Sequence, residues 1–491
     1  MSELLPLAIV LPIVASAAAV IVGRVREEGG WYLALIGTAV QVGLAIGIAT
    51  QVFGGGRITH QLAGFPPPQG IQLVADGLSA AVLSVVAVVG FVVLGYTRDS
   101  ETHRTAFYAG YLLLVGGLAG VTLTGDLFNM YVFLEITGLA AYALVASANT
   151  GRSALAGLRY LIIGTIGASL FLLGVGYAFV ATGTLNMMDL SAELAAAGYR
   201  SRLVLASFAL IVTGLAIKTA LFPVHTWQPE AYASAPDSVS TLISALVSTA
   251  AAYAIARVLY SVYTVEFFAA VPIAQDLLVY AAALSVVAGS VLAVLQSEIK
   301  RMLAYSSVSQ FGLVVAAFAL ANQTAFLGGT IHLVGHAVMK GGLFAAAGVI
   351  AIRTGARTVD EYADLAAEAP IASGTFAVLG LALVGVPPAV GFVGKWYIAL
   401  GAVAEGVWII AAVILLSTLL TLAYFARVIE RMYFGMDVPG EAAAVADGGR
   451  PTISPKLAIA VAAVVAVIVM GLGATWFASL LEPTMEFLFG L

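Results

Sequence analysis

The chain alternates long apolar runs with short polar breaks along its 491 residues. A helix of about 20 apolar residues crosses the roughly 30 Å hydrocarbon core of a bilayer. The runs therefore predict an all-α polytopic membrane protein of about fourteen transmembrane helices. These spans are expected near Leu4–Val22, Trp31–Phe53, Leu78–Tyr96, Ala106–Thr122, Leu127–Val145, Tyr160–Val180, Leu203–Phe222, Ser238–Tyr260, Leu277–Leu295, Met302–Leu320, Ala325–Ile352, Gly374–Phe392, Val407–Phe425 and Leu457–Phe477.

Composition supports a membrane bundle and limits its chemistry. Hydrophobic residues make up 61% of the chain and charged residues only 10%, whereas a soluble domain carries about 25% charged residues. The Met-Ser-Glu start lacks the basic region and cleavage site of a signal peptide, so we expect Leu4–Val22 to be retained. The chain has no cysteine, which excludes disulfides, thiolate metal sites and iron–sulfur ligation within it.

Basic residues are distributed unequally between the two sets of predicted loops. Short cytoplasmic loops collect Lys and Arg, so the richer side is predicted to be cytoplasmic and both termini to lie on the other side of a cell membrane. The richer side holds Arg24, Arg26, Arg98, Arg104, Arg152, Arg159, Lys300, Arg301, Arg353, Arg357, Arg427, Arg431, Arg450 and Lys456. The poorer side holds Arg57, Arg200, Arg202 and Arg257. The remaining basic residues, Lys218, Lys340 and Lys395, fall inside spans.

Two helices are predicted to be broken beside buried lysines. Lys218 precedes Pro223 in one half of the chain, and the pair Pro387-Pro388 precedes Lys395 in the other half. Proline removes a backbone donor, so helical hydrogen bonding lapses at both places. Matched interruptions in two halves indicate an inverted-repeat transporter with sites near the membrane midplane. The alternative is a pair of proline kinks without function.

Glu135 is the carboxylate that lies deepest in a predicted span. A carboxylate in hydrocarbon costs at least a few kcal/mol unless it is paired, protonated or hydrated. Lys218 is its natural partner, because a buried lysine can titrate nearer neutrality and a nearby carboxylate restores its affinity for a proton. We interpret the two residues as a switchable charge pair. A static salt bridge is the alternative.

The eleventh predicted span carries His332, His336 and Lys340 at intervals of four residues. This spacing places the three side chains on one helical face. A proton relay through neutral imidazoles is the favoured interpretation, with Lys395 ending the series. Metal ligation is disfavoured by the neighbouring lysine, and histidines that merely pack in the core remain an alternative.

Polar residues that do not carry charge extend this path. Singly, Ser and Thr in membrane helices usually bond a backbone carbonyl, but together they suggest a hydrated route. The candidates are Thr219, His225, Ser244, Ser248, Thr249, Ser306, Ser307, Ser309 and Gln310.

Five stretches of the chain carry a family resemblance. They are Thr124-Gly-Asp-Leu-Phe-Asn-Met-Tyr-Val-Phe-Leu-Glu135, Lys218-Thr-Ala-Leu-Phe-Pro-Val-His-Thr-Trp-Gln-Pro-Glu-Ala-Tyr-Ala-Ser-Ala-Pro236, Glu298-Ile-Lys-Arg-Met-Leu-Ala-Tyr-Ser-Ser-Val-Ser-Gln310, His336-Ala-Val-Met-Lys340 and Gly391-Phe-Val-Gly-Lys395-Trp. Together they resemble the antiporter-like subunits shared by Mrp-type cation/proton antiporters, membrane-bound hydrogenases and respiratory complex I. The Gly-Asp-Leu-Phe-Asn form in the first stretch is most similar to the D subunit of the Mrp group.

The resemblance implies an architecture. Two inverted five-helix repeats, 106–260 and 277–425, would be flanked by the spans of 1–105 and 457–491. It also implies a charge pair of Glu135 and Lys218, a central relay of His332, His336 and Lys340, and Lys395 as the exit-side lysine.

The resemblance implies partners as well. They would be other membrane subunits of a hetero-oligomer, the lipid bilayer, protons and a monovalent cation such as sodium, with no nucleic acid and no cofactor. Three functions remain open: a cation/proton antiporter subunit, an antiporter-like subunit of a redox-driven pump, and a scaffold that has lost transport. No nucleotide loop or flavin motif occurs, so the chain is not expected to be a redox catalyst.

One position departs from the resemblance. Relatives typically carry a lysine where this chain has Thr249, so a titratable group between Lys218 and the histidines is missing. We expect water held by Ser248 and Thr249 to bridge the gap.

Overall fold

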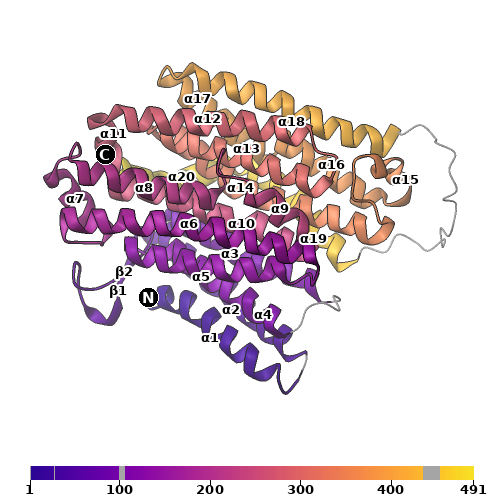
Figure 1. Cartoon of the computed structure of the whole chain (residues 1–491), viewed down its shortest axis with the longest axis horizontal. Coiled ribbons are helices and arrows are strands. Elements are labelled where there is room, and N and C mark those ends of the chain that lie inside the picture. The colour runs from indigo at the N-terminus through magenta and orange to yellow at the C-terminus, as the bar shows by residue number, and fades with distance from the viewer. Residues whose placement is uncertain (1, 27, 99–104, 435–453, 491) are drawn as a thin grey trace.

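The computed structural model describes residues 2–26, 28–98, 105–434 and 454–490. The described chain is almost entirely helical, and most of its helices run alongside one another in a single bundle (Figure 1). Within the described residues, 13 helices are long and apolar enough to cross a membrane, judged by length and composition. The prediction of an all-α polytopic membrane protein is confirmed.

The first half of the bundle is built from eleven labelled helices. They are α1 (Leu4–Val22), α2 (Gly29–Gly55), α3 (Gly77–Leu94), α4 (Thr105–Leu123), α5 (Leu127–Ala146), α6 (Gly151–Thr182), α7 (Met187–Ala197), α8 (Arg202–Thr219), α9 (Trp227–Ser234), α10 (Asp237–Arg257) and α11 (Thr264–Ala270). A π-helical segment, Val258–Tyr263, joins α10 to α11, and a short antiparallel hairpin of β1 (Ile58–Gln61) and β2 (Gln72–Ala75) pairs His60 with Leu73.

The second half is built from nine labelled helices, most of them long. They are α12 (Pro272–Val294), α13 (Ile299–Ala319), α14 (Gln323–Thr354), α15 (Leu365–Glu368), α16 (Pro370–Val384), α17 (Val390–Ala404), α18 (Trp408–Phe434), α19 (Pro455–Leu472) and α20 (Ala474–Phe489). Short 3₁₀ turns occupy Leu62–Gly64, Gly95–Thr97 and Asp360–Tyr362.

The predicted spans need two corrections. The span expected at Gly374–Phe392 is not one helix: α16 ends at Val384 and α17 begins at Val390, with the proline pair in the break. The span expected at Leu457–Phe477 is interrupted at Gly473, where α19 gives way to α20. The breaks expected near Lys218 and Lys395 are confirmed. The inverted relation of the repeats and the division into segments stay predictions.

Helix α10 lies at the centre of the bundle. From Ser238 to Arg257 every one of its residues is buried, because helices of both halves surround it. It contacts α3, α4, α5 and α8 of the first half and α13 and α14 of the second half. The centre of the fold is therefore the place where polar groups of the two halves can meet.

Small residues allow the flanking helices to approach closely. A Cβ atom added at Gly214 of α8 would lie 2.5 Å from the carbonyl oxygen of Gly167 in α6. Close approach at small residues is how membrane helices associate where lipid gives no hydrophobic driving force. This contact fixes the position of α8, which ends one residue after Lys218.

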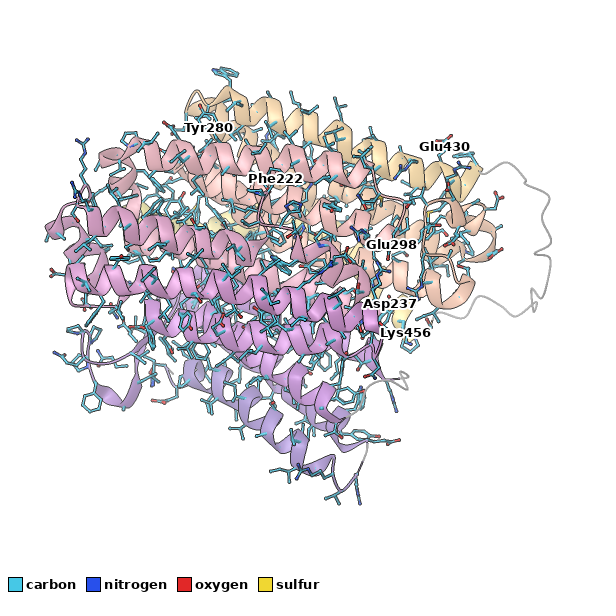
Figure 2. The ribbon with its side chains drawn as sticks, viewed as in Figure 1. Phe222, Asp237, Tyr280, Glu298, Glu430 and Lys456 are labelled. Atoms are coloured by element: carbon cyan, nitrogen blue, oxygen red, sulfur yellow. The ribbon has the colours of Figure 1, made fainter. Side chains whose placement is uncertain are left out.

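Both chain termini lie at the same end of the bundle (Figure 1). Asp237, Glu298 and Lys456 lie toward the opposite end (Figure 2). The assignment of two basic residues to loops was wrong. Arg257 is the last residue of α10 and Lys300 lies in the first turn of α13, and both are buried. Each has a carboxylate partner far away in the sequence, which sequence spacing does not reveal.

Candidate functional site

The break between α8 and α9 places Lys218 at a helix end inside the bundle. Helix α8 ends because Ala220 adopts a left-handed conformation and Pro223 has no backbone donor to continue the helix. The indole nitrogen of Trp227 donates to the carbonyl of Ile217 at 2.9 Å. A carbonyl near the helix end is thereby satisfied, and α9 is fastened to the turn that carries Lys218. Phe222 marks this break in Figure 2.

Lys218 and Glu135 form the charge pair that the sequence predicts. The Lys218 ammonium lies 2.6 Å from Oε1 of Glu135 in α5 and 3.4 Å from the hydroxyl of Tyr142, further along α5. The Lys218 side chain is 10% exposed and that of Glu135 is 23% exposed. The pair is therefore not fully enclosed by the chain, and the carboxylate is the more exposed of the two groups.

A buried hydrogen-bond cluster on α9 and α10 lies beyond this pair. The amide nitrogen of Gln228 donates to the hydroxyls of Ser248 at 3.0 Å and Tyr232 at 3.2 Å, and these two hydroxyls lie 3.2 Å apart. All three side chains are fully buried. Ser248 was a candidate from the sequence, but Gln228 and Tyr232 were missed. The sequence feature that could have pointed to these two is that both are polar and lie in the stretch that follows Pro223.

Thr249 does not join this cluster. Its hydroxyl donates to the carbonyl of Ala245 in its own helix at 2.7 Å. A threonine in a membrane helix commonly makes this bond to the preceding turn. Near the position where relatives typically carry a lysine, the polar group that joins the cluster is therefore Ser248, which is bonded to Gln228 and Tyr232.

Helix α14 carries His332, His336 and Lys340, called the ladder below, in the fully buried centre of the bundle. The Nε2 atom of His332 lies 2.8 Å from Oε1 of Gln310 in α13, and the rings of His332 and His336 are 6.4 Å apart between centroids. The His336 ring packs on Phe311, and neither of its nitrogens has a hydrogen-bond partner among the described residues. A buried imidazole with unused donor and acceptor positions can take and pass a proton when water reaches it.

Lys340 ends the ladder toward the first half of the chain. Its ammonium donates to the carbonyl of Leu303 at 2.7 Å and to the hydroxyl of Ser306, both in α13. No carboxylate is its ion-pair partner among the described residues, and the side chain is fully buried. A Cβ atom added at Gly341 would lie 3.4 Å from Cβ of Ala245 in α10, and the ring of Tyr232 packs against Phe344, one turn beyond Lys340. The α9–α10 cluster therefore borders the turn of α14 that carries Lys340.

Lys395 lies at the second helix break. Its ammonium donates to the carbonyls of Leu383 and Val384, each at 2.9 Å, which are the last two residues of α16. The negative end of the α16 dipole favours a cation there. A Cβ atom added at Gly394 would lie 2.7 Å from Cβ of His332, so α17 packs directly on α14 beside the first histidine.

The other polar candidates divide into two groups. Ser244 bonds the carbonyl of Thr241 in its own helix. Ser307 bonds the carbonyl of Leu303, the same carbonyl that accepts from Lys340. His225 lies between the rings of Phe222 and Tyr305, with its Nδ1 unpartnered within the described part of the chain. Thr219 also has an unpartnered hydroxyl there, Ser309 bonds Ser290 at 2.8 Å, and Ser306 and Gln310 contact the ladder as described.

Two further ion pairs of buried basic residues were not predicted from the sequence. Arg257 is paired with Asp76, and Lys300 lies 3.0 Å from Asp237 while donating to the carbonyl of Ala235 at 2.7 Å. The partners are 181 and 63 residues apart in the chain. In the described ranges, no group of three or more His, Asp or Glu side chains is arranged to hold a metal ion.

Comparison with known proteins identifies the family. Residues 124–421 match the family described as NADH:quinone oxidoreductase/Mrp antiporter, TM. The chain belongs to this NADH:quinone oxidoreductase/Mrp antiporter family. The match covers both broken helices, the charge pair and the ladder, and the resemblance drawn from the motifs is confirmed.

Named relatives fall on both sides of the family. The N subunit of the NADH-quinone oxidoreductase of Desulforudis audaxviator is 40% identical over 95% of this chain and 94% of its own length. The D subunit of the Na⁺/H⁺ antiporter of Bacillus subtilis is 32% identical over 87% of each chain. A chain in the structure of the Mrp complex from Dietzia sp. DQ12-45-1b superposes with a TM-score of 0.89 and 25% identity, covering 99% of this chain and 97% of that one.

Proposed function

We propose that the chain is the proton-translocating subunit of a multisubunit monovalent cation (Na⁺)/proton antiporter. The observation that carries the proposal is the Glu135–Lys218 pair at a helix break, followed inward by buried polar groups as far as Lys340, the histidines and Lys395. Ionisable groups in a membrane interior are costly and usually mark ion pathways. Here the groups come from α8, α10, α14 and α17, each of which packs on the next in that order.

The proton path begins with release from Lys218. While Glu135 is near, it stabilises the charged ammonium; when the two separate, burial favours the neutral amine and the proton leaves. The hydroxyls of Ser248 and Tyr232 can each accept and donate a proton, and Gln228 holds them in place. Lys340, His336 and His332 then receive the proton, and Lys395 passes it out of the second half.

The antiporter relative from Bacillus subtilis and the fold shared with a chain of the Mrp complex support a place among other membrane subunits. The partial exposure of Glu135 agrees with a neighbour on that face. A second candidate is an antiporter-like, proton-pumping subunit of a redox-driven complex. The 40% identity to the N subunit of an NADH-quinone oxidoreductase favours it.

Purification of the native complex through a tag on this chain separates the two candidates. The proposal expects small membrane subunits to co-purify and the preparation to lack flavin and iron–sulfur absorption. Stoichiometric flavin or iron–sulfur clusters would instead assign the chain to a redox-driven complex. A control purification from cells without the tag identifies proteins that bind the resin alone.

The hydroxyl of Ser248 is expected to matter more than that of Thr249. Ser248→Ala removes a relay hydroxyl bonded to Gln228 and Tyr232 and should lower proton flux by about tenfold or more. Thr249→Val is the matched control, because it removes a hydroxyl bonded only to its own helix. Proton flux in vesicles that hold equal amounts of assembled complex measures both. Equal flux in the two variants would exclude Ser248 from the path.

We further propose that both termini lie outside the cytoplasm. Even with the correction of Arg257 and Lys300, the basic loops gather at the end opposite the termini. A reporter fused after Lys456 should read as cytoplasmic and one fused after Leu491 should not. The opposite pair of readings would reverse the orientation.

A further inference from the structure

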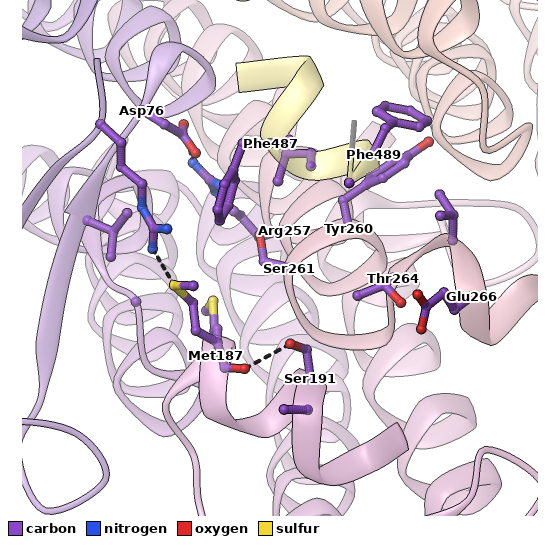
Figure 3. A pocket seen from close by; sticks show the side chains of 18 of the residues that line it. Asp76, Met187, Ser191, Arg257, Tyr260, Ser261, Thr264, Glu266, Phe487 and Phe489 are labelled. Atoms are coloured by element: carbon purple, nitrogen blue, oxygen red, sulfur yellow. Dashed lines mark hydrogen bonds and ion pairs between the residues drawn. The ribbon is translucent and has the colours of Figure 1, made fainter. Parts of the chain in front are cut away.

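A cavity of about 310 Å³ lies at the end of the bundle where the two termini are found. Segments far apart in the sequence surround it: the loop before β1, the end of β2, α7, the π-helical segment after α10, and the end of α20 (Figure 3). Its lining mixes apolar side chains with polar ones, and the polar ones include Ser191, Ser261 and Glu266. A cavity of this size with polar groups in its wall has room for several water molecules.

The inner wall of this cavity contains a buried ion pair. Asp76, the N-cap residue of α3, is 3% exposed, and Arg257, the last residue of α10, is 5% exposed. The Arg257 guanidinium contacts Oδ1 of Asp76, donates to Ser79 Oγ at 2.6 Å and donates from Nε to the Tyr253 hydroxyl at 2.8 Å. The second carboxylate oxygen of Asp76 has no hydrogen-bond partner among the described residues.

Charge keeps this pair ionised. Burial alone raises the pKa of Asp76, but the charge and hydrogen bond of Arg257, together with the Ser79 amide and the charge of Arg57, outweigh burial and hold that pKa below its usual value. Arginine does not lose its proton in proteins. The inner wall of the cavity therefore carries the fixed positive charge of Arg257 paired with Asp76, and Arg57 lines the same cavity as a second cation.

A polar stripe leads inward from this wall along α10. Thr249, Tyr253 and Arg257 are spaced by four residues and share one helical face. The Tyr253 hydroxyl donates to the carbonyl of Thr122 in α4 at 2.7 Å and lies 3.1 Å from Ser79 Oγ. One turn beyond Thr249, a Cβ atom added at Gly341, next to Lys340, would lie 3.4 Å from Cβ of Ala245. The stripe thus leads from the wall of the cavity toward the turn of α14 that carries Lys340.

We propose that the cavity is an aqueous vestibule, and that the Asp76–Arg257 ion pair is the barrier between its water and the polar stripe of α10. A fixed arginine at the narrow part of a pathway repels protons and cations. Without this barrier, water at the terminal face would connect with the relay and short-circuit it. The inference rests on the proposed function, since such a barrier serves a chain whose interior conducts protons.

Because the chain has no cysteine of its own, single introduced cysteines can test whether water reaches the cavity. In the assembled complex, Ser261→Cys should react with a membrane-impermeant cationic methanethiosulfonate added on the side of the termini. Ala254→Cys, at a fully buried position of α10, should not react and serves as the matched control. An unreactive Ser261→Cys in assembled complex would overturn the vestibule.

Silver ions test the barrier in a Thr249→Cys variant. A thiol that has bound silver no longer reacts with maleimide, so the maleimide reaction of the unfolded protein measures how much of the thiol silver has reached. With the ion pair intact this thiol should resist silver, and in the Asp76→Asn/Arg257→Gln background it should react at least about tenfold faster. The double neutral change avoids an uncompensated buried charge. Arg257→Gln alone is the second variant, because Asp76 can then take up a proton. The thiol of Ala254→Cys should resist silver in every background.

Two results would overturn the barrier. One is a Thr249→Cys thiol that reacts with silver while the ion pair is intact, and the other is a thiol that still resists silver in an assembled variant without the pair. Neither readout depends on transport. A failure of proton flux in the relay variants would therefore contradict the proposed function without affecting these results.

Discussion

Glu135→Ala and Lys218→Ala are each expected to lower ion-coupled proton flux by about 10²-fold or more while the chain still inserts and assembles. Each change removes half of the pair in which the ammonium lies 2.6 Å from the carboxylate. Without Glu135 the proton affinity of Lys218 can no longer be switched, and without Lys218 there is no proton to release. Flux is measured with a pH-sensitive dye in sealed vesicles, normalised to assembled complex.

A double change to Glu135→Leu/Lys218→Leu distinguishes a switch from a structural bridge. Replacing a buried pair by apolar residues can restore packing, so assembly should recover while flux should not. Arg152→Ala is the control, because it breaks an ion pair with Glu298 at a more exposed place and should transport normally. Recovery of flux in the double variant would show that the pair only holds α5 and α8 together.

Lys340→Met and Lys340→Arg are both expected to abolish proton flux, again by about 10²-fold or more. Methionine fills similar space without a proton, and arginine keeps the charge but does not release its proton. The arginine variant is the more informative one. A residue needed only as a buried cation bonded to Leu303 and Ser306 would tolerate it better than methionine.

Ser306→Ala serves as the control for Lys340. It removes one hydrogen-bond partner of the ammonium and leaves the carbonyl of Leu303 in place, so flux should fall by less than about tenfold. Wild-type flux in Lys340→Arg, with loss in Lys340→Met, would contradict a proton relay at this position.

The parts of the site that were predictable from sequence are those with a local signal. The spacing of His332, His336 and Lys340 fixes a helical face whatever surrounds it. Pro223 and the proline pair mark the helix breaks because proline cannot donate to the helical ladder. Glu135 and Lys218 could be paired because few charges remain inside the spans.

The parts that sequence missed depend on long-range packing. Arg257 and Lys300 lie near the ends of their predicted spans, where a charge normally reaches water, and only the fold brings Asp76 and Asp237 to them. Gln228 and Tyr232 lie on the short helix α9, which has no apolar run in the sequence that would predict it. Thr249 was expected to hold water, but its rotamer bonds Ala245, a choice that the sequence does not determine.

The most direct test of the central claim is proton movement in purified complex reconstituted into sealed vesicles with no electron donor present. A sodium gradient is imposed across the vesicle membrane and the internal pH is followed, with the Lys218→Ala complex as the reference for leak. The account predicts that protons move opposite to sodium, at a rate that rises with the gradient and is absent in the reference. A pH change that appears only when an electron donor and quinone are supplied, or an equal change in both preparations, would contradict it.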